Sequence, residues 1–326
     1  MGLSGASLAI DAGNSKTDVA LVGADGRVLG TARGGGFQPP VVGVGPAVDV
    51  LAPLVASVLA QAGAEGPVAH VSAYLANADL PVEETALEAE IAGRGWAGSV
   101  TVANDTFALL RAGLPDGAEP RGVAVVCGAG INGVGLGRDG ATARFPSVGR
   151  ISGDWGGGGH LADEALWFAA RAEDGRGGPS ALARALPAHF GLTTMAELIE
   201  ALHLRRLPDH RRYELTPVLF AVAADGDAVA RSIVERQADE VVLLAAVALD
   251  RLELLGEEIR VVLGGGVLAA RHPLLHERVV RLLAERAPKA VAHVVTAPPV
   301  LGAALSALDR AGAPAAAYAR LRETWT

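Results

Sequence analysis

Short apolar runs separated by glycine-containing turns form the first thirty residues of the chain. One run ends at Asp11, and the next begins at Val19 after a polar stretch that holds Gly13 and Asn14. Apolar runs of this length around a glycine turn predict two strands joined by a tight connection. Asp25-Gly26 marks another turn before an apolar segment at 27–32, so an antiparallel meander of three strands is expected.

Helical and strand-like periods then alternate. Apolar residues at 48, 51, 55 and 59 predict a helix within 46–62, and the nearly continuous apolar run at 68–76 is typical of a buried strand. A helix over 81–93 and a strand over 99–103 complete a βββαβαβ order, which indicates an α/β domain with a mixed sheet. The segment 34–40, GGGFQPP, is expected to be a loop without a regular element.

The second half of the chain starts with the same pattern. Apolar residues 122–127, a glycine turn at 128–130, an extended segment at 132–137, Asp139-Gly140 and a strand at 142–145 repeat the order of the first hairpin unit. This weak internal repeat predicts two similar domains. Helices are expected between 161 and 255, the longest over about 227–255, followed by a βαβα run of strand 259–263, helix 274–286, strand 291–295 and a helix from about 300.

Composition limits the class of protein. At 326 residues the chain exceeds the usual size of a single core, so two domains are expected, 1–117 and 118–326, the second with a helical insertion. The net charge of −8 and the pI near 5.5 argue against a nucleic-acid partner. No signal peptide is visible, and the longest strongly apolar run, 241–249, is too short to cross a bilayer, so we expect a soluble cytoplasmic protein without a membrane partner.

The turn after Asp11 is suited to phosphate. Gly13 permits backbone N–H groups to converge on an anion, Lys16 adds a point charge, and Asp11 could hold a hydrated magnesium ion against the same phosphates. An ordinary hairpin with a solvated turn uses the same residue types and remains an alternative. Lysine occurs only at Lys16 and Lys289, and all other basic residues are arginine, which favours the phosphate interpretation.

Asp105 is a candidate for catalysis because it follows the strand 101–103 and opens a helix. Ligands of open α/β sheets lie beyond the carboxyl ends of the strands. The alternative is that Asn104 or Asp105 simply caps the helix. Gly128, Ala129 and Gly130 form a second candidate phosphate cradle, with a plain glycine hairpin as the alternative.

Two other glycine clusters draw attention. The run from Gly153 to Gly159 lies just before a helix and indicates either close backbone approach or movement, unless it is a flexible surface loop. Gly264, Gly265 and Gly266 could pass beneath a nucleotide or form a tight turn. Neither the dinucleotide fingerprint nor the G-x-x-x-x-G-K-[ST] loop is present. His160, His189, His203 and His210 lack metal-ligand spacing with partner carboxylates and are expected to be surface or structural residues.

Taken together, these motifs resemble those of the superfamily of acetate and sugar kinases, chaperone ATPases and actin. Residues 11–17 resemble its first phosphate motif D-G-G-G-T-K-T, 128–132 the second motif G-T-G-S-N, and 264–266 its adenosine motif, while Asn104-Asp105 falls where its kinases carry the catalytic aspartate. Within the superfamily, 153–156 resembles the G-D-E-G segment of the N-acetylglucosamine kinases and BadF/BadG/BcrA/BcrD-type ATPases, and 299–303 their P-x-x-G-A turn.

The resemblance implies two actin-like, ribonuclease H-like domains with mixed sheets and an interdomain cleft for ATP and sugar. It implies Asp105 as the catalytic base and Asp11 as the residue that positions Mg²⁺ through water. The residues it implies for ATP binding are Asp11, Gly13, Asn14, Ser15, Lys16, Thr17, Gly128, Ala129, Gly130, Gly264, Gly265 and Gly266. Those it implies for the sugar are Gln38, Asn104, Asp105, Asn132, Gly153 and Asp154.

Three positions depart from the family pattern. Ala129 replaces a threonine between the glycines of the second motif, and Trp155 stands where the family has glutamate. Gln38 appears at the position of a sugar-binding asparagine and is one methylene longer, so sugar identity is the least constrained part of the resemblance.

The favoured function is an ATP-dependent kinase of an N-acetylated hexosamine, most simply N-acetylglucosamine to its 6-phosphate, and a homodimer is compatible with it. A catalytically idle sugar sensor is an alternative suggested by Ala129 and Trp155, although the presence of Asp11 and Asp105 speaks against it. Activators of radical dehydratases share an iron–sulfur cluster between two subunits that each give two cysteines, and Cys127 alone cannot supply them. A sugar-responsive repressor would need an added DNA-binding domain, and none is expected before the first strand.

Overall fold

The computed structural model describes residues 5–117 and 119–325. Its contacts divide the chain into two compact units. Unit 1 consists of Met1–Ala124, Val134–Pro146 and Val295–Thr326, and unit 2 of Val125–Gly133 and Ser147–Val294. The expected division between 117 and 118 stays a prediction, because Ala118 lies outside the described residues. The C-terminal segment groups with unit 1, which no periodic pattern had indicated.

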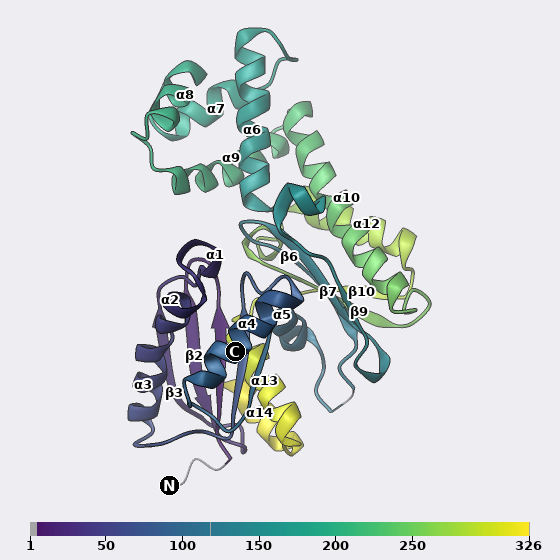
Figure 1. The fold of residues 1–326 in the computed structure, drawn as a ribbon. Helices are drawn as coiled ribbons and strands as arrows, with labels where there is room; N and C mark the ends of the chain where they lie inside the picture. Colours follow the sequence, from purple (N-terminus) through teal and green to yellow (C-terminus); the bar gives the residue numbers. More distant parts are fainter. Residues whose placement is uncertain (1–4, 118, 326) are drawn as a thin grey trace. The chain divides into compact units, whose positions relative to one another are not determined.

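A five-stranded mixed sheet forms the centre of unit 1, in the order β3-β2-β1-β4-β5 (Figure 1). The first three strands pair antiparallel, whereas β4 and β5 run parallel to β1. This confirms the expected meander and the mixed sheet. The strands are β1 Ser7–Ala12, β2 Thr17–Val22, β3 Val28–Gly34, β4 His70–Leu75 and β5 Val100–Asn104.

Helices cover both faces of this sheet. Alternate residues of β1 divide between two cores: Leu8 and Ile10 pack with α2, α3 and α4, whereas Ala9 packs with α13 and α14. This is the period of two expected of a strand buried on both faces. The helices of unit 1 are α1 Pro39–Val42, α2 Val44–Asp49, α3 Ala52–Gln61, α4 Pro81–Gly93, α5 Asp105–Gly113, α13 Pro299–Ala311 and α14 Ala315–Glu323.

Two predictions in this unit are wrong. The segment 34–40 is not wholly irregular, because Pro39 and Pro40 begin α1, where a missing N–H costs nothing in the first helical turn. The single helix expected within 46–62 is two helices, which meet at Val50 and Leu51.

The stretch Val44–Gln61 has the length and composition of a membrane span. Val48, Val55 and Val58 of this stretch lie in the hydrophobic core of unit 1.

The second sheet has the order β10-β9-β6-β7-β8. Counted along the chain within each sheet, both sheets follow the same order 3-2-1-4-5, which confirms the internal repeat. Strands β7 and β8 pair antiparallel and β9 and β10 pair parallel. The strands are β6 Gly122–Cys127, β7 Ile131–Leu136, β8 Thr142–Arg144, β9 Ile259–Gly264 and β10 Ala290–Val294.

Unit 2 carries the helical insertion, and α10 and α12 pack side by side in it (Figure 1). The predicted helix-rich region is confirmed, but its first helix begins earlier than expected, at Gly157 within the glycine run. The helices are α6 Gly157–Asp174, α7 Leu182–His189, α8 Met195–His203, α9 Leu215–Ala224, α10 Ala228–Arg251, α11 Gly266–Ala269 and α12 Pro273–Arg286.

Candidate functional site

The turn between β1 and β2 is closed by the backbone N–H of Gly13, which donates to the carbonyl oxygen of Lys16 at 2.8 Å. The loop after β3 packs against this turn, because the N–H of Phe37 donates to the oxygen of Gly13 at 2.9 Å. A Cβ at Gly36 would lie 2.1 Å from the carbonyl oxygen of Asn14. The glycine at 36 therefore permits close backbone approach rather than flexibility.

Two amide side chains hold the tip of this turn. Nε2 of Gln38 donates to the carbonyl oxygen of Asn14 at 3.0 Å, and Nδ2 of Asn77 donates to Asn14 Oδ1 at 2.8 Å. Asn77 has a left-handed φ of 60° and also approaches the carbonyl oxygen of Phe37 at 3.3 Å. Asn77 is not among the residues predicted from the sequence. The position just beyond the carboxyl end of a strand, which identified Asp105, would have identified it too.

The other polar residues of the turn differ in access. Ser15 is exposed, and the half-exposed Lys16 ammonium lies 3.8 Å from Asp18. Thr17 is fully buried, and its Oγ1 has no hydrogen-bond partner among the described residues. Thr17 is the first residue of β2, so its backbone lies where the turn ends and the strand begins.

Asp11 is a buried carboxylate among like charges. It lies directly opposite Asp18 in the β1–β2 register, and Asp18 is neutralised by Arg33, whose Nε donates to it at 2.6 Å. Burial, followed by the charges of Asp105 and Asp18, raises the pKa of Asp11 to about 8, and Lys16 lowers it only in part. A group of this kind is stabilised as a carboxylate when a cation is placed beside it.

Asn104, not Asp105, caps helix α5. Its Oδ1 accepts the backbone N–H of Thr106 at 3.0 Å, and its Nδ2 donates to Asp79 Oδ1 at 2.8 Å. Asp105 is the first helical residue and is half-buried. Burial raises the pKa of Asp105 to about 6, opposed by hydrogen bonds from Thr106. Because Asn104 caps the helix, capping does not explain why a carboxylate stands at position 105.

In unit 2, the turn at 128–130 packs directly on the start of α6. The N–H groups of Gly158 and Gly159 donate to the carbonyl oxygens of Gly128 and Ala129, both at 2.8 Å. The N–H of Gly157 donates to Gln237 Oε1 at 2.8 Å. The first N–H groups of α6 are therefore occupied by protein acceptors and do not form an anion site.

Two glycines in these segments are required by close packing. A Cβ at Gly157 would lie 2.3 Å from the carbonyl carbon of Gly130, and one at Gly265 would lie 2.4 Å from the oxygen of Cys127. Both have positive φ, +80°. The close-approach interpretation of the glycine run is thus confirmed for Gly157. The surface-loop alternative is wrong for residues 156–158, which are buried.

Gln237 was not predicted either. It is fully buried on α10, and it bonds both Gly157 and, through Nε2 at 3.5 Å, Cys127 Sγ. A glutamine at helical spacing from Ile233, Val234 and Val241 on a buried helix face was the available signal.

The predicted sugar residues of unit 2 are tied to nearby turns. Oδ1 of Asn132 accepts from Ser147 Oγ at 2.5 Å, and Oδ2 of Asp154 accepts from Gly149 N at 3.0 Å and from Ser152 Oγ at 2.5 Å. Gly153 has a left-handed φ of +87°. These contacts fix the orientation of both polar side chains.

Trp155 is buried, and Arg236 lies over its ring at 4.1 Å. Its Nε1 has no hydrogen-bond partner among the described residues. Trp155, which stands where the family pattern has glutamate, is thus a buried packing residue with a positively charged guanidinium group over its ring.

Cys127 is free and buried, and burial raises the pKa of its thiol. No group of three or more His, Cys, Asp or Glu residues in 5–117 and 119–325 could hold a metal ion.

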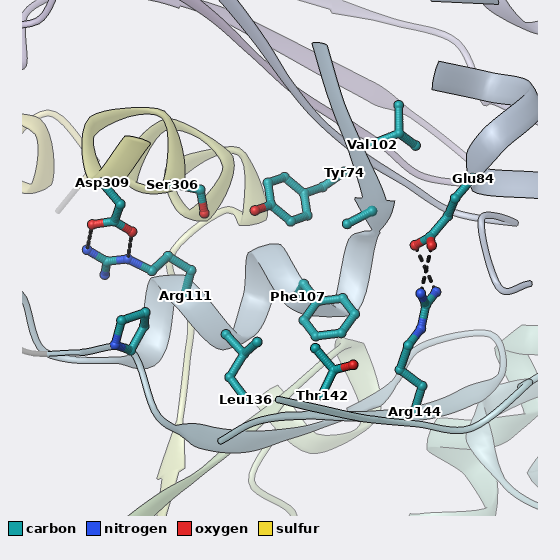
Figure 2. A pocket seen from close by; sticks show the side chains of 12 residues that line it. Tyr74, Glu84, Val102, Phe107, Arg111, Leu136, Thr142, Arg144, Ser306 and Asp309 are labelled. Atoms are coloured by element: carbon teal, nitrogen blue, oxygen red, sulfur yellow. Dashed lines mark hydrogen bonds and ion pairs between the residues drawn. The ribbon is translucent and has the colours of Figure 1, made fainter. Parts of the chain in front are cut away.

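A cavity of about 360 Å³ lies in unit 1 beside α5 and contains none of the predicted site residues (Figure 2). Its charged groups are paired with one another. Arg144 forks onto Glu84 at 2.7 and 2.8 Å, and Arg111 forks onto Asp309 at 2.6 and 3.0 Å. The Arg111–Asp309 pair ties helix α5, which begins at Asp105, to α13. The Arg144–Glu84 pair joins β8 to α4, and Arg144 also lies over the ring of Phe107 on α5 at 5.6 Å.

A family model described as the BadF/BadG/BcrA/BcrD ATPase family matches residues 8–307. The chain belongs to this family. The match covers both glycine turns, Asp105 and the closing turn at 299–303, so the family expected from the short motifs is confirmed.

Two curated relatives are similar over part of the chain. One is an N-acetylmuramic acid/N-acetylglucosamine kinase of Clostridium acetobutylicum, 25% identical over 193 residues, or 59% of this chain and 62% of that protein. The other is an N-acetyl-D-glucosamine kinase of Dictyostelium discoideum, 26% identical over 210 residues, or 64% of this chain and 65% of that protein. The matched part therefore spans somewhat less than two thirds of each relative.

The fold is shared with a solved structure of a provisionally named N-acetylglucosamine kinase of Chromobacterium violaceum. The TM-score is 0.70 at 22% identity, with 94% of this chain and 99% of the other covered. This BadF-family chain therefore has the two-sheet fold expected from the resemblance.

Proposed function

We propose that this BadF-family chain is an ATP-dependent kinase of an N-acetylated hexosamine, with N-acetylglucosamine converted to its 6-phosphate as the favoured reaction. The observation that carries the proposal is Asp105, a half-buried carboxylate that is not the cap of its helix and whose pKa is raised to about 6. A base with a pKa near the working pH is suited to accepting the proton of an alcohol. The names of the two curated relatives support the sugar class.

In the proposed reaction, the sugar hydroxyl oxygen attacks the γ-phosphorus of ATP. The bond between that phosphorus and the β–γ bridging oxygen breaks, the hydroxyl proton passes to Asp105 Oδ, and ADP leaves. Phosphoryl transfer depends mainly on positioning and charge neutralisation. Asp105 starts a helix fixed at its other end by Arg111, so its carboxylate is held in place.

Asp11 fits a role beside magnesium. Burial, followed by the charges of Asp105 and Asp18, raises the pKa of its carboxyl group, and Lys16 opposes this only in part, so a further positive charge beside it would be favourable. Magnesium bound between one carboxylate and the phosphates, as is usual for this ion, would supply that charge and neutralise the phosphates. We propose that Asp11 holds it through water.

For ATP, we propose that Lys16 supplies positive charge and that backbone groups of Gly13, Asn14 and Ser15 contact the phosphates. Thr17 is assigned a backbone role only, because its side chain is fully buried. Gly128, Ala129, Gly130 and the glycines at 264–266 are proposed to contribute backbone contacts to the nucleotide.

For the sugar, we propose Gln38, Asn104, Asp105, Asn132, Gly153 and Asp154. Because Gln38 Nε2 already donates to Asn14, its Oε1 is the group left for the sugar. Asn132 and Asp154 are oriented by Ser147 and Ser152. The 117/118 domain division, a cytoplasmic location, a homodimer, and the absence of nucleic-acid and membrane partners stay predictions.

The test is a coupled ADP-release assay over N-acetyl sugars, amino sugars and plain hexoses. We expect turnover with N-acetylglucosamine and a 6-phosphate product by NMR. Absence of ADP release with every sugar would contradict the proposal.

A catalytically idle sugar-binding protein of the same fold is the second candidate. Two departures from the family pattern favour it: Ala129 lacks the hydroxyl group of the family's threonine, and the packed Trp155 lacks the carboxylate of the family's glutamate. Sugar binding measured by calorimetry without ADP release would select this candidate over the kinase.

A further inference from the structure

An apolar pocket of about 240 Å³ opens in unit 1 between α1, α2 and α4. Its apolar walls are Pro39, Pro40, Val44, Val82, Ala86 and Leu87. None of the residues assigned above to ATP or sugar lines it, so the proposed function leaves it without an occupant.

The pocket adjoins both parts of the proposed site in this unit. Its wall at Pro39 directly follows Gln38 in the chain, and Asn77, which also lines it, donates to Asn14 at 2.8 Å. On the other side, Glu83 accepts the N–H of Asp79 at 3.0 Å, and Asp79 accepts from Asn104. Hydrogen bonds therefore connect residues that line the pocket to the β1–β2 turn at Asn14 and to the cap of α5 at Asn104.

The two polar side chains that line the pocket, Asn77 and Glu83, each have one atom engaged in hydrogen bonds with the protein. Nδ2 of Asn77 donates to Asn14 and approaches Phe37, and Oε2 of Glu83 accepts from two backbone N–H groups, of Asp79 and Leu80. The Glu83 carboxylate would also repel an anion. The remaining surface is suited to an uncharged apolar group.

Building on the proposed kinase function, we propose that this pocket receives the acyl chain of the acceptor sugar, and that the chain therefore accepts N-acyl amino sugars with acyl groups longer than acetyl. The acyl chain is the apolar, uncharged part of such a sugar. A water-sized group requires only about 10–15 Å³ of cavity by this measure, so about 240 Å³ has room for several carbons beyond a methyl group.

The experiment compares glucosamine with its N-acetyl, N-propanoyl and N-butanoyl derivatives in the ADP-release assay. Each buried methylene is expected to lower KM by about three- to fourfold from acetyl to butanoyl, with kcat changed little. A carboxylate-bearing substituent of the same length is expected to lose this gain because of Glu83.

Ala86→Phe tests the pocket itself, because Ala86 is an exposed position of α4 and a phenyl ring there would fill the space. We expect the preference for butanoyl over acetyl to disappear in this variant. Ala92→Phe, at another exposed position of the same helix outside the pocket, is the matched control and should keep the preference. Circular dichroism verifies that both variants are folded.

The outcomes separate this inference from the function on which it rests. If no sugar is phosphorylated, the kinase proposal falls and the inference with it. If N-acetylglucosamine is phosphorylated but longer acyl groups raise KM, or Ala86→Phe keeps the butanoyl preference, only the inference is overturned. A change in oligomeric state of Ala86→Phe on size exclusion, with an unchanged acyl preference, would assign the pocket to a contact between chains instead.

Discussion

Asn104 accepts the backbone N–H of Thr106 at 3.0 Å and thereby caps helix α5, leaving Asp105 as the first residue inside the helix. A carboxylate at this position is favoured by the helix dipole but is not needed for capping. The two adjacent residues, which sequence alone could not separate, therefore have different expected phenotypes.

Asp105→Asn should remove the proposed base while keeping a residue of the same shape. We expect kcat to fall about 10²–10⁴-fold with ATP affinity changed little, measured by the ADP-release assay and calorimetry. Stability should not fall, because one of the like charges near Asp11 is removed.

Asn104→Ala is the matched variant. Loss of the cap should lower the free energy of unfolding by about 1 kcal/mol, which urea denaturation would detect. Near-normal turnover in Asp105→Asn together with this stability loss in Asn104→Ala would leave α5 with a structural role only.

Gly157→Ala should be strongly destabilising. The added Cβ would approach the backbone of Gly130 within 2.3 Å at a φ of +80°, so we expect a loss of at least about 3 kcal/mol in thermal or urea unfolding. Gly153→Ala is the control, since its φ is +87° but nothing lies within 4 Å of a Cβ there. It should lose only about 1–2 kcal/mol, the cost of the left-handed conformation. Equal losses in the two variants would show that contact with Gly130 is unimportant.

Much of the fold was predictable because strand burial and glycine turns are local signals. The segments 122–127 and 81–93 match β6 and α4 residue for residue. The assignment of the C-terminal helices to unit 1 was not predictable, since it depends on the contact of α13 with the distant strand β1. The two prolines of α1 were misjudged because proline breaks a helix only beyond its first turn.

Charged residues of the candidate site could be predicted because they stand in short sequence motifs. The amide side chains that hydrogen-bond to these segments were missed. Asp11, Lys16 and Asp105 were predicted from their position and residue type, and their roles stay predictions. Asn77 bonds the β1–β2 turn and Gln237 bonds the start of α6 through long-range hydrogen bonds. A single asparagine or glutamine has no sequence pattern that specifies such a partner.

His70 should make stability depend on pH. Burial, then the charge of Arg310, lowers the pKa of His70 to about 4, opposed by its hydrogen bond to Ser99. The unfolded chain, with a pKa near 6.5, binds a proton between pH 6.5 and 4 that the folded chain does not. The free energy of unfolding contributed by His70 should therefore fall by roughly 3 kcal/mol as pH decreases through this range.

The measurement is urea unfolding of wild type and His70→Gln at pH 7.5, 5.5 and 4.5. Asp11 contributes with the opposite sign, because its folded pKa is raised, so the difference between the two proteins is the relevant quantity. If that difference is independent of pH, His70 is not the titrating group.

Arg111 ties α5 to α13 from a buried position. It is 4% exposed, and it donates to Asp309 at 2.6 and 3.0 Å and to Asp116 at 2.9 Å. Arg111→Leu would leave Asp309 without this partner, whereas Asp116 keeps Arg322 at 2.6 Å. Removing one partner of a buried pair costs about 3–5 kcal/mol, and because Asp309 is partly exposed we expect a value near the lower end of this range.

The double variant Arg111→Leu/Asp309→Leu separates the ion pair from packing. If the uncompensated carboxylate causes the loss, replacing it should recover most of the stability, since apolar replacement of a buried pair is often neutral. Arg281→Ala, which breaks the exposed pair with Glu285, should have no measurable effect. A double variant as unstable as Arg111→Leu would instead indicate that other contacts of the arginine, such as its guanidinium group over the Tyr318 ring, hold α5 in place. Turnover should then fall in both variants because Asp105 moves with the helix.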